Sequence, residues 1–524
     1  MSSQSILLRN ATVLVPGPAE GDQSVVPLRG HSLLVQGNKI ARIAAHIDAP
    51  SDKTQVIDCT GKIVSPGFID THHHVWQTQL KGRHADHTLI EYWPTGNMQS
   101  FNYTPEDIFW GELGGCLEAL NAGTTTVVDH AHMNYSPAHN TNAIAATASS
   151  GIRSTFCYAP TPRFNEWEPE LSLDPEMVPG WAVEQVEQLI KDGPYGDGRV
   201  TVGLAFDALF LPKDVVADLY ARVRRAGAKV ITTHYVRGPV LGESVSRGLA
   251  FRVFGDGRLT GAPKGENSVV EMLEAHGVLG SDILLSHATN LYDSDARKLT
   301  EADASISSTP DTELQMGQGN PVCFRDDTRS ISSFGVDCHS NNGSSLINQM
   351  RLGLQAERGI RNQALIAKGK APRHLDLSTQ DVFRMGTMGG ARAVGMQDQL
   401  GSLQEGKLAD IVIFDGLSPG MICAADEDPV AAIVLHSSTA DVETVIVDGR
   451  IVKQRGSLLP VELDLSLSDL KPAKTRLEWS DVAGELLKSR ERVIEAGKKS
   501  WGGDMEKTLG GLMKMFKIKP DSFA

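Results

Sequence analysis

Residues 66–74 read PGFIDTHHH, a short apolar run followed at once by three histidines. Side chains alternate along a strand, so His72 and His74 lie on one face and His73 on the other. Two imidazoles on one face at the C-terminal end of a strand can share one metal ion. A solvated turn is the alternative interpretation of this stretch alone, and the other strand ends of the chain decide between the two.

From about residue 66 to residue 390, short buried strands alternate with helical stretches, which is the pattern of repeated βα units. Strands are expected at 67–71, 124–129, 152–158, 199–206, 229–234, 283–287, 304–308 and 333–337. The helices between them include 105–121, 181–191, 213–226, 268–276 and 294–301. Eight strands with intervening helices predict an α/β fold, a (β/α)8 TIM barrel whose parallel sheet is buried on both faces.

Both ends of the chain are rich in β-branched runs separated by turns. The runs lie at 6–8, 11–15, 32–36, 39–43 and 55–58, and again at 409–414, 431–436, 441–447 and 450–452. Gly37-Asn38 and Asp448-Gly449 are typical of tight hairpin turns. We expect the two ends to pair into one small composite β-sandwich beside the barrel.

This organisation predicts four parts: sandwich strands over 1–65, the barrel over 66–390, further sandwich strands over 391–470, and a helical extension over 471–524. Residues 475–496 have the apolar spacing of one helix face and should pack on the body or on a second subunit. The Gly-rich insertion between Tyr235 and Asn267 is a candidate cover for the active site.

Three other predicted strands also end in residues that bind metals: His234 ends the fifth strand, His287 the sixth and Asp337 the eighth. The C-terminal ends of barrel strands meet on one face, where catalytic residues lie. Buried, unpaired His and Asp side chains are costly, so packing alone is a poor explanation for four such strand ends. The chain therefore favours a site over a solvated turn.

The nitrogen and oxygen donors suit one divalent metal ion, Zn²⁺ first, with Fe²⁺ or Mn²⁺ as alternatives. A bound ion lowers the pKa of water towards about 7 and so provides hydroxide at neutral pH. Asp337 can accept the proton of this water, and His287 can hydrogen-bond the hydroxide or polarise the bond under attack.

The chain resembles the amidohydrolase superfamily, in the branch of cytosine deaminase, guanine deaminase, chlorohydrolases and methylthioadenosine/adenosylhomocysteine deaminases. Residues 64–74 are similar to the family pattern P-G-[FL]-[IV]-[DN]-x-H-x-H, and residues 123–129 to its second strand. Residues 389–395 and 401–412 resemble the passage from the barrel back to the sandwich. The resemblance implies a metal-dependent barrel hydrolase with one composite sandwich.

By position, the resemblance implies that His72, His74, His234 and Asp337 bind a single metal ion. It gives His287 a role nearer to catalysis than to metal binding. The fourth predicted strand, which reads VGLAFD over 202–207, has no lysine at its end. The dinuclear arrangement with a carbamylated lysine is therefore not supported.

One departure from the family pattern concerns proton transfer. Deaminases of this branch place a glutamate three residues after the fifth-strand histidine, where this chain has Arg237. Arginine cannot act as a general acid or base near neutral pH, which puts ordinary deamination in doubt. Arg237 could instead clamp a carboxylate or stabilise an oxyanion, or it could be a solvated loop residue. His339 and Glu313 are the substitute proton carriers nearby.

Further residues are candidates for the substrate pocket. His130 and His132 follow the second strand and could contact substrate, or form a second pair of metal ligands. Gln77 and Trp93 could line the pocket, although ordinary packing explains an aromatic residue there equally well.

Composition excludes several partners. The 524 residues include 50 Lys and Arg against 64 Asp and Glu, a formal net charge of −14. This balance argues against nucleic acid and against an anionic membrane surface, both of which need clustered positive charge. Six scattered cysteines and an N-terminus without a signal-peptide pattern predict a cytoplasmic protein. A homodimer or larger homo-oligomer is expected from the frequency of two-fold assemblies.

The sequence thus predicts a metal-dependent hydrolase that cleaves a C–N bond (amide, urea, carbamate or amidine-like) in a small, ring-containing molecule. Three alternatives stay open. The first is deamination or dehalogenation of a heteroaromatic ring with a non-standard proton carrier. The second is a metal-dependent lyase, decarboxylase or isomerase, and the third is a binding protein that has lost catalysis.

Overall fold

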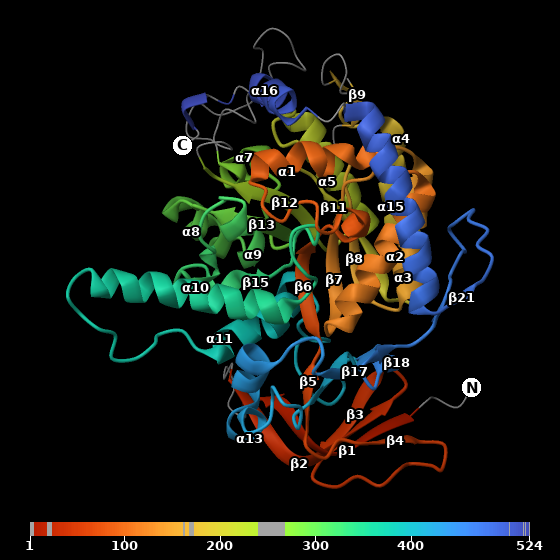
Figure 1. The fold of residues 1–524 in the computed structure, drawn as a ribbon, viewed down its shortest axis with the longest axis vertical. Helices are drawn as coiled ribbons and strands as arrows, with labels where there is room; N and C mark the ends of the chain where they lie inside the picture. Colours follow the sequence, from red (N-terminus) through yellow and green to blue (C-terminus); the bar gives the residue numbers. More distant parts are fainter. Residues whose placement is uncertain are drawn as a thin grey trace.

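The computed structural model describes residues 5–17, 24–160, 163–166, 172–174, 176–238, 268–501, 504–516, 518 and 520–522. Its centre is an eight-stranded parallel sheet in the order β15-β14-β13-β12-β11-β8-β7-β6 (Figure 1). The strands are β6 (Phe68–His73), β7 (Thr124–Ala131), β8 (Arg153–Tyr158), β11 (Val200–Ala205), β12 (Ile231–Val236), β13 (Ile283–Thr289), β14 (Ser305–Ser308) and β15 (Ser332–Phe334). Each overlaps one of the eight predicted strands, so the barrel prediction is confirmed.

The barrel closes where its first strand meets the loop after its last. The backbone N–H of Asp337 donates to the carbonyl of His72 at 2.8 Å, and the N–H of His74 donates to the carbonyl of Asp337 at 3.1 Å. The carboxylate of Asp70 accepts from the N–H of Val336 at 3.1 Å and so reinforces the seam. The same hydrogen bonds therefore close the sheet and bring the first and last predicted ligands together.

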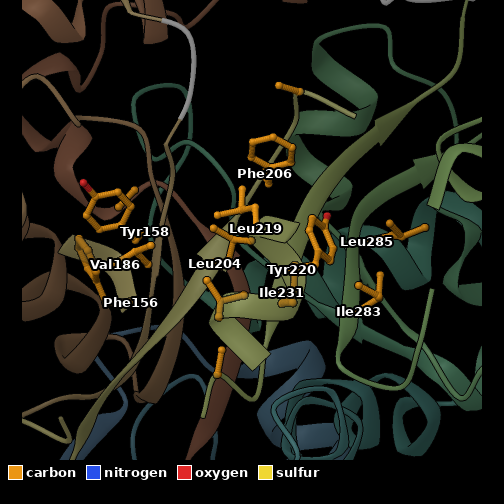
Figure 2. Packing of buried hydrophobic residues seen from close by; sticks show 14 of the residues in the cluster. Phe156, Tyr158, Val186, Leu204, Phe206, Leu219, Tyr220, Ile231, Ile283 and Leu285 are labelled. Carbon is orange, nitrogen blue, oxygen red and sulfur yellow. The ribbon is translucent and has the colours of Figure 1, made fainter. Parts of the chain in front are cut away.

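Helices cover the outside of the sheet. They include α2 (Pro105–Asn121), α3 (Pro137–Ser150), α4 (Gly180–Asp192), α5 (Lys213–Ala226), α7 (Val269–His276), α8 (Asp293–Glu301) and α10 (Leu346–Ile366). The hydroxyl of Thr104 caps α2 by accepting from the N–H of Asp107, as N-cap residues do. Val186 of α4 and Leu219 of α5 are buried with strand residues such as Phe156 and Leu204 (Figure 2). This packing holds the strand ends in place.

A second, nine-stranded sheet joins the two ends of the chain. Its order is β19-β18-β17-β16-β5-β1-β2-β3, with β4 paired to β1. The N-terminal strands are β1 (Ser5–Pro16), β2 (Val25–Gln36), β3 (Lys39–Ala44), β4 (Gln55–Asp58) and β5 (Lys62–Pro66). The C-terminal strands are β16 (Ile411–Asp415), β17 (Val442–Val447), β18 (Arg450–Gln454) and β19 (Ser457–Leu458). Antiparallel pairing of β16 with β5 connects them, as predicted.

One predicted strand is wrong. Residues 431–436 are helical, in α14 (Pro429–Ala431) and the π-helix η6 (Ala432–His436). The carboxylate of Asp428 accepts from the N–H groups of Val430 and Ala431, and Pro429 occupies the first helical position. The helix cap at Asp428 therefore outweighs the strand propensity of the β-branched residues that follow it. The predicted domain boundaries stay predictions, and residues 239–267 of the predicted insertion lie outside the described residues.

The C-terminal extension packs on the body of the protein. Helix α15 (Trp479–Trp501) runs beside α2 (Figure 1). The carboxylate of Asp107 in α2 accepts from the hydroxyl of Ser489 at 2.7 Å and from the guanidinium of Arg492 at 2.7 Å. Helix α16 (Met505–Phe516) contacts α1 (Leu89–Thr95). None of the described helices combines the length and apolar composition that crossing a bilayer requires.

An ion-pair cluster ties the barrel to the terminal sheet. Arg153 at the start of β8 is buried and forms two hydrogen bonds with the carboxylate of Asp410, at 2.9 and 3.0 Å. A third hydrogen bond, at 3.0 Å, reaches Asp448. Burial of a guanidinium is tolerated only when its charge is paired in this way.

Removing one partner of this buried cluster should destabilise the fold. We expect Asp410→Ala to lower the free energy of unfolding by about 3 kcal/mol, because Arg153 stays buried with half of its partners lost. Arg450→Ala breaks an exposed pair with Asp197 and should cost below about 1 kcal/mol. Urea unfolding of both variants checks this, and equal losses would contradict the assigned role of Asp410.

His84 anchors the loop that follows β6. Its two ring nitrogens lie 2.7 Å from the hydroxyl of Ser340 and 3.1 Å from that of Thr95. Burial lowers its pKa to about 3. The folded state therefore holds a neutral imidazole that the unfolded chain would protonate below a pH of about 6.5.

His84 should make stability depend on pH in a defined direction. Its contribution is complete above a pH of about 6.5 and is lost as the pH falls towards 3, because the unfolded chain then binds the extra proton. Between pH 7.5 and 4 we expect the protein to lose about 3 kcal/mol more stability than the His84→Asn variant. Urea titrations at both pH values measure the difference, and parallel losses would refute it.

Candidate functional site

Four side chains converge at the C-terminal end of the barrel. One ligand atom from each of His72, His74, His234 and Asp337 lies within 4.8 Å of the others. The Nε2 atoms of His72 and His74 lie 3.2 and 3.1 Å from the same carboxylate oxygen, Oδ1 of Asp337. The structure therefore brings together the four residues that the sequence predicts as metal ligands.

The hydrogen bonds of these histidines show which nitrogen is available to a metal. The Nδ1–H of His74 donates to the carbonyl of His130 at 2.9 Å, and that of His234 donates to Oδ2 of Asp207 at 3.0 Å. Each ring is thereby left with a lone pair on Nε2. In His74 this lone pair faces a carboxylate oxygen, and Nε2 of His72 is buried with no hydrogen-bond partner in the described structure. A cation among these atoms resolves both unfavourable contacts, so the donor set fits a metal ion.

Electrostatics agree with this assignment for two of the three histidines. Burial lowers the pKa of His72 and of His74, so both rings are neutral at pH 7, as ligands must be. Burial opposes a charge on His234, but the carboxylate of Asp207 outweighs it and raises the pKa of this ring.

Asp207 holds His234 in place and was not among the predicted site residues. Its Oδ1 accepts from the backbone N–H of His234 at 2.9 Å and from the hydroxyl of Thr233 at 3.0 Å. Asp207 directly follows β11, the fourth barrel strand, so its position was the available signal.

His287 lies beside the cluster. Its ring centroid is 5.2 Å from that of His72 and 5.7 Å from that of His234. Its Nδ1 lies 2.8 Å from the hydroxyl of Thr309, which leaves Nε2 for the site. His287 and Asp337 have φ angles of 69° and 65°, which residues other than glycine seldom adopt. Such backbone conformations gather at functional sites, where they aim side chains.

Glu313 lies behind His287, in the short helix α9 (Pro310–Gln315). Its Oε1 accepts from the N–H of Thr309 at 2.7 Å and lies 3.7 Å from Nδ1 of His287. Its Oε2 is buried and has no hydrogen-bond partner among the described residues. Burial raises the pKa of this carboxyl, as in enzymes that use a carboxylic acid to carry protons.

His339 is not brought to the cluster. Its Nδ1 lies 2.9 Å from Nε2 of His73, whose Nδ1 in turn lies 2.8 Å from Asp70. A Cβ atom on Gly115 of α2 would meet the ring of His339 at 2.9 Å, which places this ring between β6 and α2. Because His73 points away from His72 and His74, its partner His339 lies on the helix side of the strand. Direct proton transfer to substrate does not fit this position.

The guanidinium of Arg237 contacts neighbouring residues at the rim of the site. Its guanidinium carbon lies 3.5 Å from the ring centroid of Tyr292, and its Nη1 donates to the carbonyl of Asn290 at 3.1 Å. Both partners belong to the segment that follows β13. The arginine is therefore held by a neighbouring loop, and it does not take the place of the glutamate absent from this position.

Of the remaining predicted pocket residues, Gln77 and Trp93 lie in the segment after β6, and His130 and His132 lie at the end of β7. The side-chain amide of Gln77 donates to the hydroxyl of Tyr92 at 2.6 Å and to Asn97 at 2.7 Å. Trp93 is partly buried against a cluster that includes Tyr92 and Cys338, the residue after Asp337. His130 and His132 form a second group with Asp207 and His234, again with ligand atoms within 4.8 Å.

The model of the amidohydrolase family matches residues 63–452, so this chain belongs to that family. It is 26% identical over 472 residues to a 5-methylthioadenosine/S-adenosylhomocysteine deaminase of Acetivibrio thermocellus, covering 87% of this chain and 96% of the relative. It is 25% identical over 511 residues to a 5'-deoxyadenosine deaminase of Methanobrevibacter smithii, covering 95% and 100%. The predicted resemblance is confirmed, and the protein is a hydrolase of this family.

Solved structures support the fold. The atrazine chlorohydrolase of Arthrobacter aurescens TC1, complexed with zinc, has a TM-score of 0.71 at 20% identity and covers 93% of this chain and 100% of its own. An adenosine deaminase of Xanthomonas campestris with bound zinc has a TM-score of 0.70 at 18% identity, covering 94% and 99%. These structures share the fold of this chain.

The four-residue cluster should govern metal content. We expect Zn²⁺ at a free concentration 100-fold above its dissociation constant to stabilise the metal-free protein by about 2.7 kcal/mol, because the ion binds only the folded state. His72→Ala should lose most of this stabilisation, since it removes a buried ligand. Thermal unfolding with and without chelator measures both effects. The exposed His46 provides the control His46→Ala, and equal stabilisation of both variants would exclude this site.

Proposed function

We propose that the protein uses one divalent ion, Zn²⁺ first, to hydrolyse a C–N bond of an amide, urea, carbamate or amidine-like group in a small, ring-containing molecule. The convergence of His72, His74, His234 and Asp337, with His287 beside them, carries this proposal. The cytoplasmic location and the homo-oligomeric state expected from the sequence remain parts of the proposal.

These four residues would hold the ion, which when bound would supply hydroxide at neutral pH and polarise the bond under attack. Asp337 is the residue placed to accept the proton of the attacking water, because its carboxylate lies within the cluster, about 3 Å from the imidazoles of His72 and His74. His287 directs Nε2 to the site, since Nδ1 is engaged by Thr309, and hydrogen-bonds the reacting group.

Glu313 takes the part of the missing glutamate in this proposal. Its carboxyl lies 3.7 Å from Nδ1 of His287 and has a raised pKa because it is buried. A carboxyl that stays protonated to higher pH can return a proton to the leaving nitrogen through His287, once Nδ1 of His287 turns from the hydroxyl of Thr309 to Glu313. The route needs no acid or base at Arg237, which is engaged with Tyr292.

Deamination or dehalogenation of a heteroaromatic ring is the second candidate. The relatives named as adenine-nucleoside deaminases and the structurally similar chlorohydrolase favour it. The first and second candidate functions both use water activated at the same centre, and they differ in the leaving group. Release of ammonia or halide would indicate the second candidate, and release of a larger amine the first.

A metal-replete screen over amides, ureas, carbamates and aminated heterocycles, which reads amine and ammonia separately, tests the proposal. With a substrate in hand, we expect Asp337→Asn and Glu313→Gln each to lower kcat by about 10²- to 10⁴-fold, the usual contribution of a positioned acid or base. Glu274→Gln, at an exposed glutamate paired with Lys298, is the matched control.

The variant results separate a structural role from a chemical one. Glu313→Gln preserves the shape of the side chain, so its metal content and melting temperature should equal those of the wild type. Unchanged turnover in Asp337→Asn or in His72→Ala, measured in metal-replete protein, would refute the proposed mechanism.

A further inference from the structure

We propose that a second divalent cation binds between His130, His132 and Asp207, with Nδ1 of His234 as the fourth donor. This inference goes beyond the proposed function, which uses one ion. The two clusters have only His234 in common, so the second can be tested by metal binding alone.

Three parts of the barrel supply the donors. His130 lies in β7, His132 directly follows that strand, and Asp207 follows β11 beside His234 of β12. Oδ2 of Asp207 is central: it lies 3.3 Å from Nε2 of His130 and 3.0 Å from Nδ1 of His234. One ligand atom from each of the four residues lies within 4.8 Å of the others.

The histidines of this cluster have unused ring nitrogens. His130 is fully buried, and its Nδ1 has no hydrogen-bond partner in the described part of the chain, while its Nε2 lies 3.3 Å from Oδ2 of Asp207 without hydrogen-bond geometry. Nδ1 of His132 is also buried without a partner. A buried polar atom left unpaired costs about 1–3 kcal/mol, and buried imidazoles are normally satisfied.

His139 shows how this chain satisfies a buried histidine that has a purely structural role. Its Nδ1 lies 2.8 Å from the hydroxyl of Ser136, and its Nε2 lies 2.9 Å from the carbonyl of Tyr103. The buried ring of His130 and the buried Nδ1 of His132 have no comparable partners. The two rings stack at a centroid distance of 4.6 Å, and each offers a ligand atom within 4.8 Å of one from Asp207.

A cation accounts for this arrangement better than a hydrogen bond within the cluster. Oδ2 of Asp207 already accepts from Nδ1–H of His234, so it has little capacity to satisfy both histidines as well. A divalent ion would take one lone pair from each ring, and the carboxylate of Asp207 would offset one of its two charges. Its binding displaces the proton on Nδ1 of His234 to solvent, so that this ring contributes Nδ1 here and Nε2 to the first cluster.

The donor set defines the class of ion. Three imidazole nitrogens and one carboxylate oxygen suit Zn²⁺, Co²⁺ or Ni²⁺, whereas Mg²⁺ and Ca²⁺ prefer oxygen donors. Because the cluster contains no lysine and does not include His287, it differs from a dinuclear site built on a carbamylated lysine.

Metal content of the full-length chain tests the proposal. The purified protein is stripped with chelator, reloaded with Co²⁺, freed of excess ion and analysed for cobalt per chain. We expect two cobalt ions per wild-type chain and one in His130→Ala and in His132→Ala. His72→Ala should also keep one ion, held by the second cluster. The control His46→Ala should keep two.

Spectroscopy of the cobalt protein gives an independent readout. Two ions that share the imidazole of His234 couple magnetically, so the electron paramagnetic resonance signal of the doubly loaded protein should be weaker per cobalt than that of His132→Ala. One cobalt per wild-type chain, or two that persist in both His130→Ala and His132→Ala, would overturn the proposal.

These measurements separate loss of the second ion from a folding defect and from the proposed hydrolase activity. Circular dichroism confirms that each variant is folded, and His132→Asn replaces His132→Ala if the alanine variant is not. Loss of the second ion with the first retained supports the second site even if no substrate is ever found. Conversely, a single cobalt per chain overturns the second site and leaves the proposed hydrolase intact.

Discussion

The structure depends on the seam between β6 and the segment that follows β15. Backbone hydrogen bonds between Asp337 and the strand that carries His72 and His74 close the barrel. The same contacts set the carboxylate of Asp337 about 3 Å from two imidazole nitrogens. Closing a sheet removes its edges, and here the closure also assembles residues that lie far apart in the chain. Fold and metal cluster are therefore two consequences of one set of hydrogen bonds.

Much of this could be predicted because the relevant signals are local. Buried strands in a parallel sheet read as short apolar runs, and His72, His234, His287 and Asp337 each lie at or near the end of one. The barrel then required these strand ends to share a face. The β-branched run at 431–436 predicts a strand, but the capping carboxylate of Asp428, which precedes the run, makes the segment helical.

Other features depend on contacts that sequence order does not reveal. Asp207 is a partner of His234 only because β11 and β12 are adjacent in the sheet. His339 is two residues from Asp337, yet the chain turns between them and its ring meets His73 on the helix side of β6. Arg237 lies three residues after His234, but stacking on Tyr292 holds it at the rim. Where a strand ends and a loop begins, closeness in sequence does not predict which way a side chain points.

The pairing of β5 with β16 has a consequence for the order in which the molecule is built. Residue 66 lies against residue 411, so the terminal sheet cannot be completed until nearly the whole polypeptide has left the ribosome. Until then the N-terminal hairpins expose an open edge, the kind of surface on which nascent chains associate. Contacts of such long sequence separation also form slowly. The barrel is thus synthesised between the two groups of strands that form the terminal sheet, and the C-terminal group is made last.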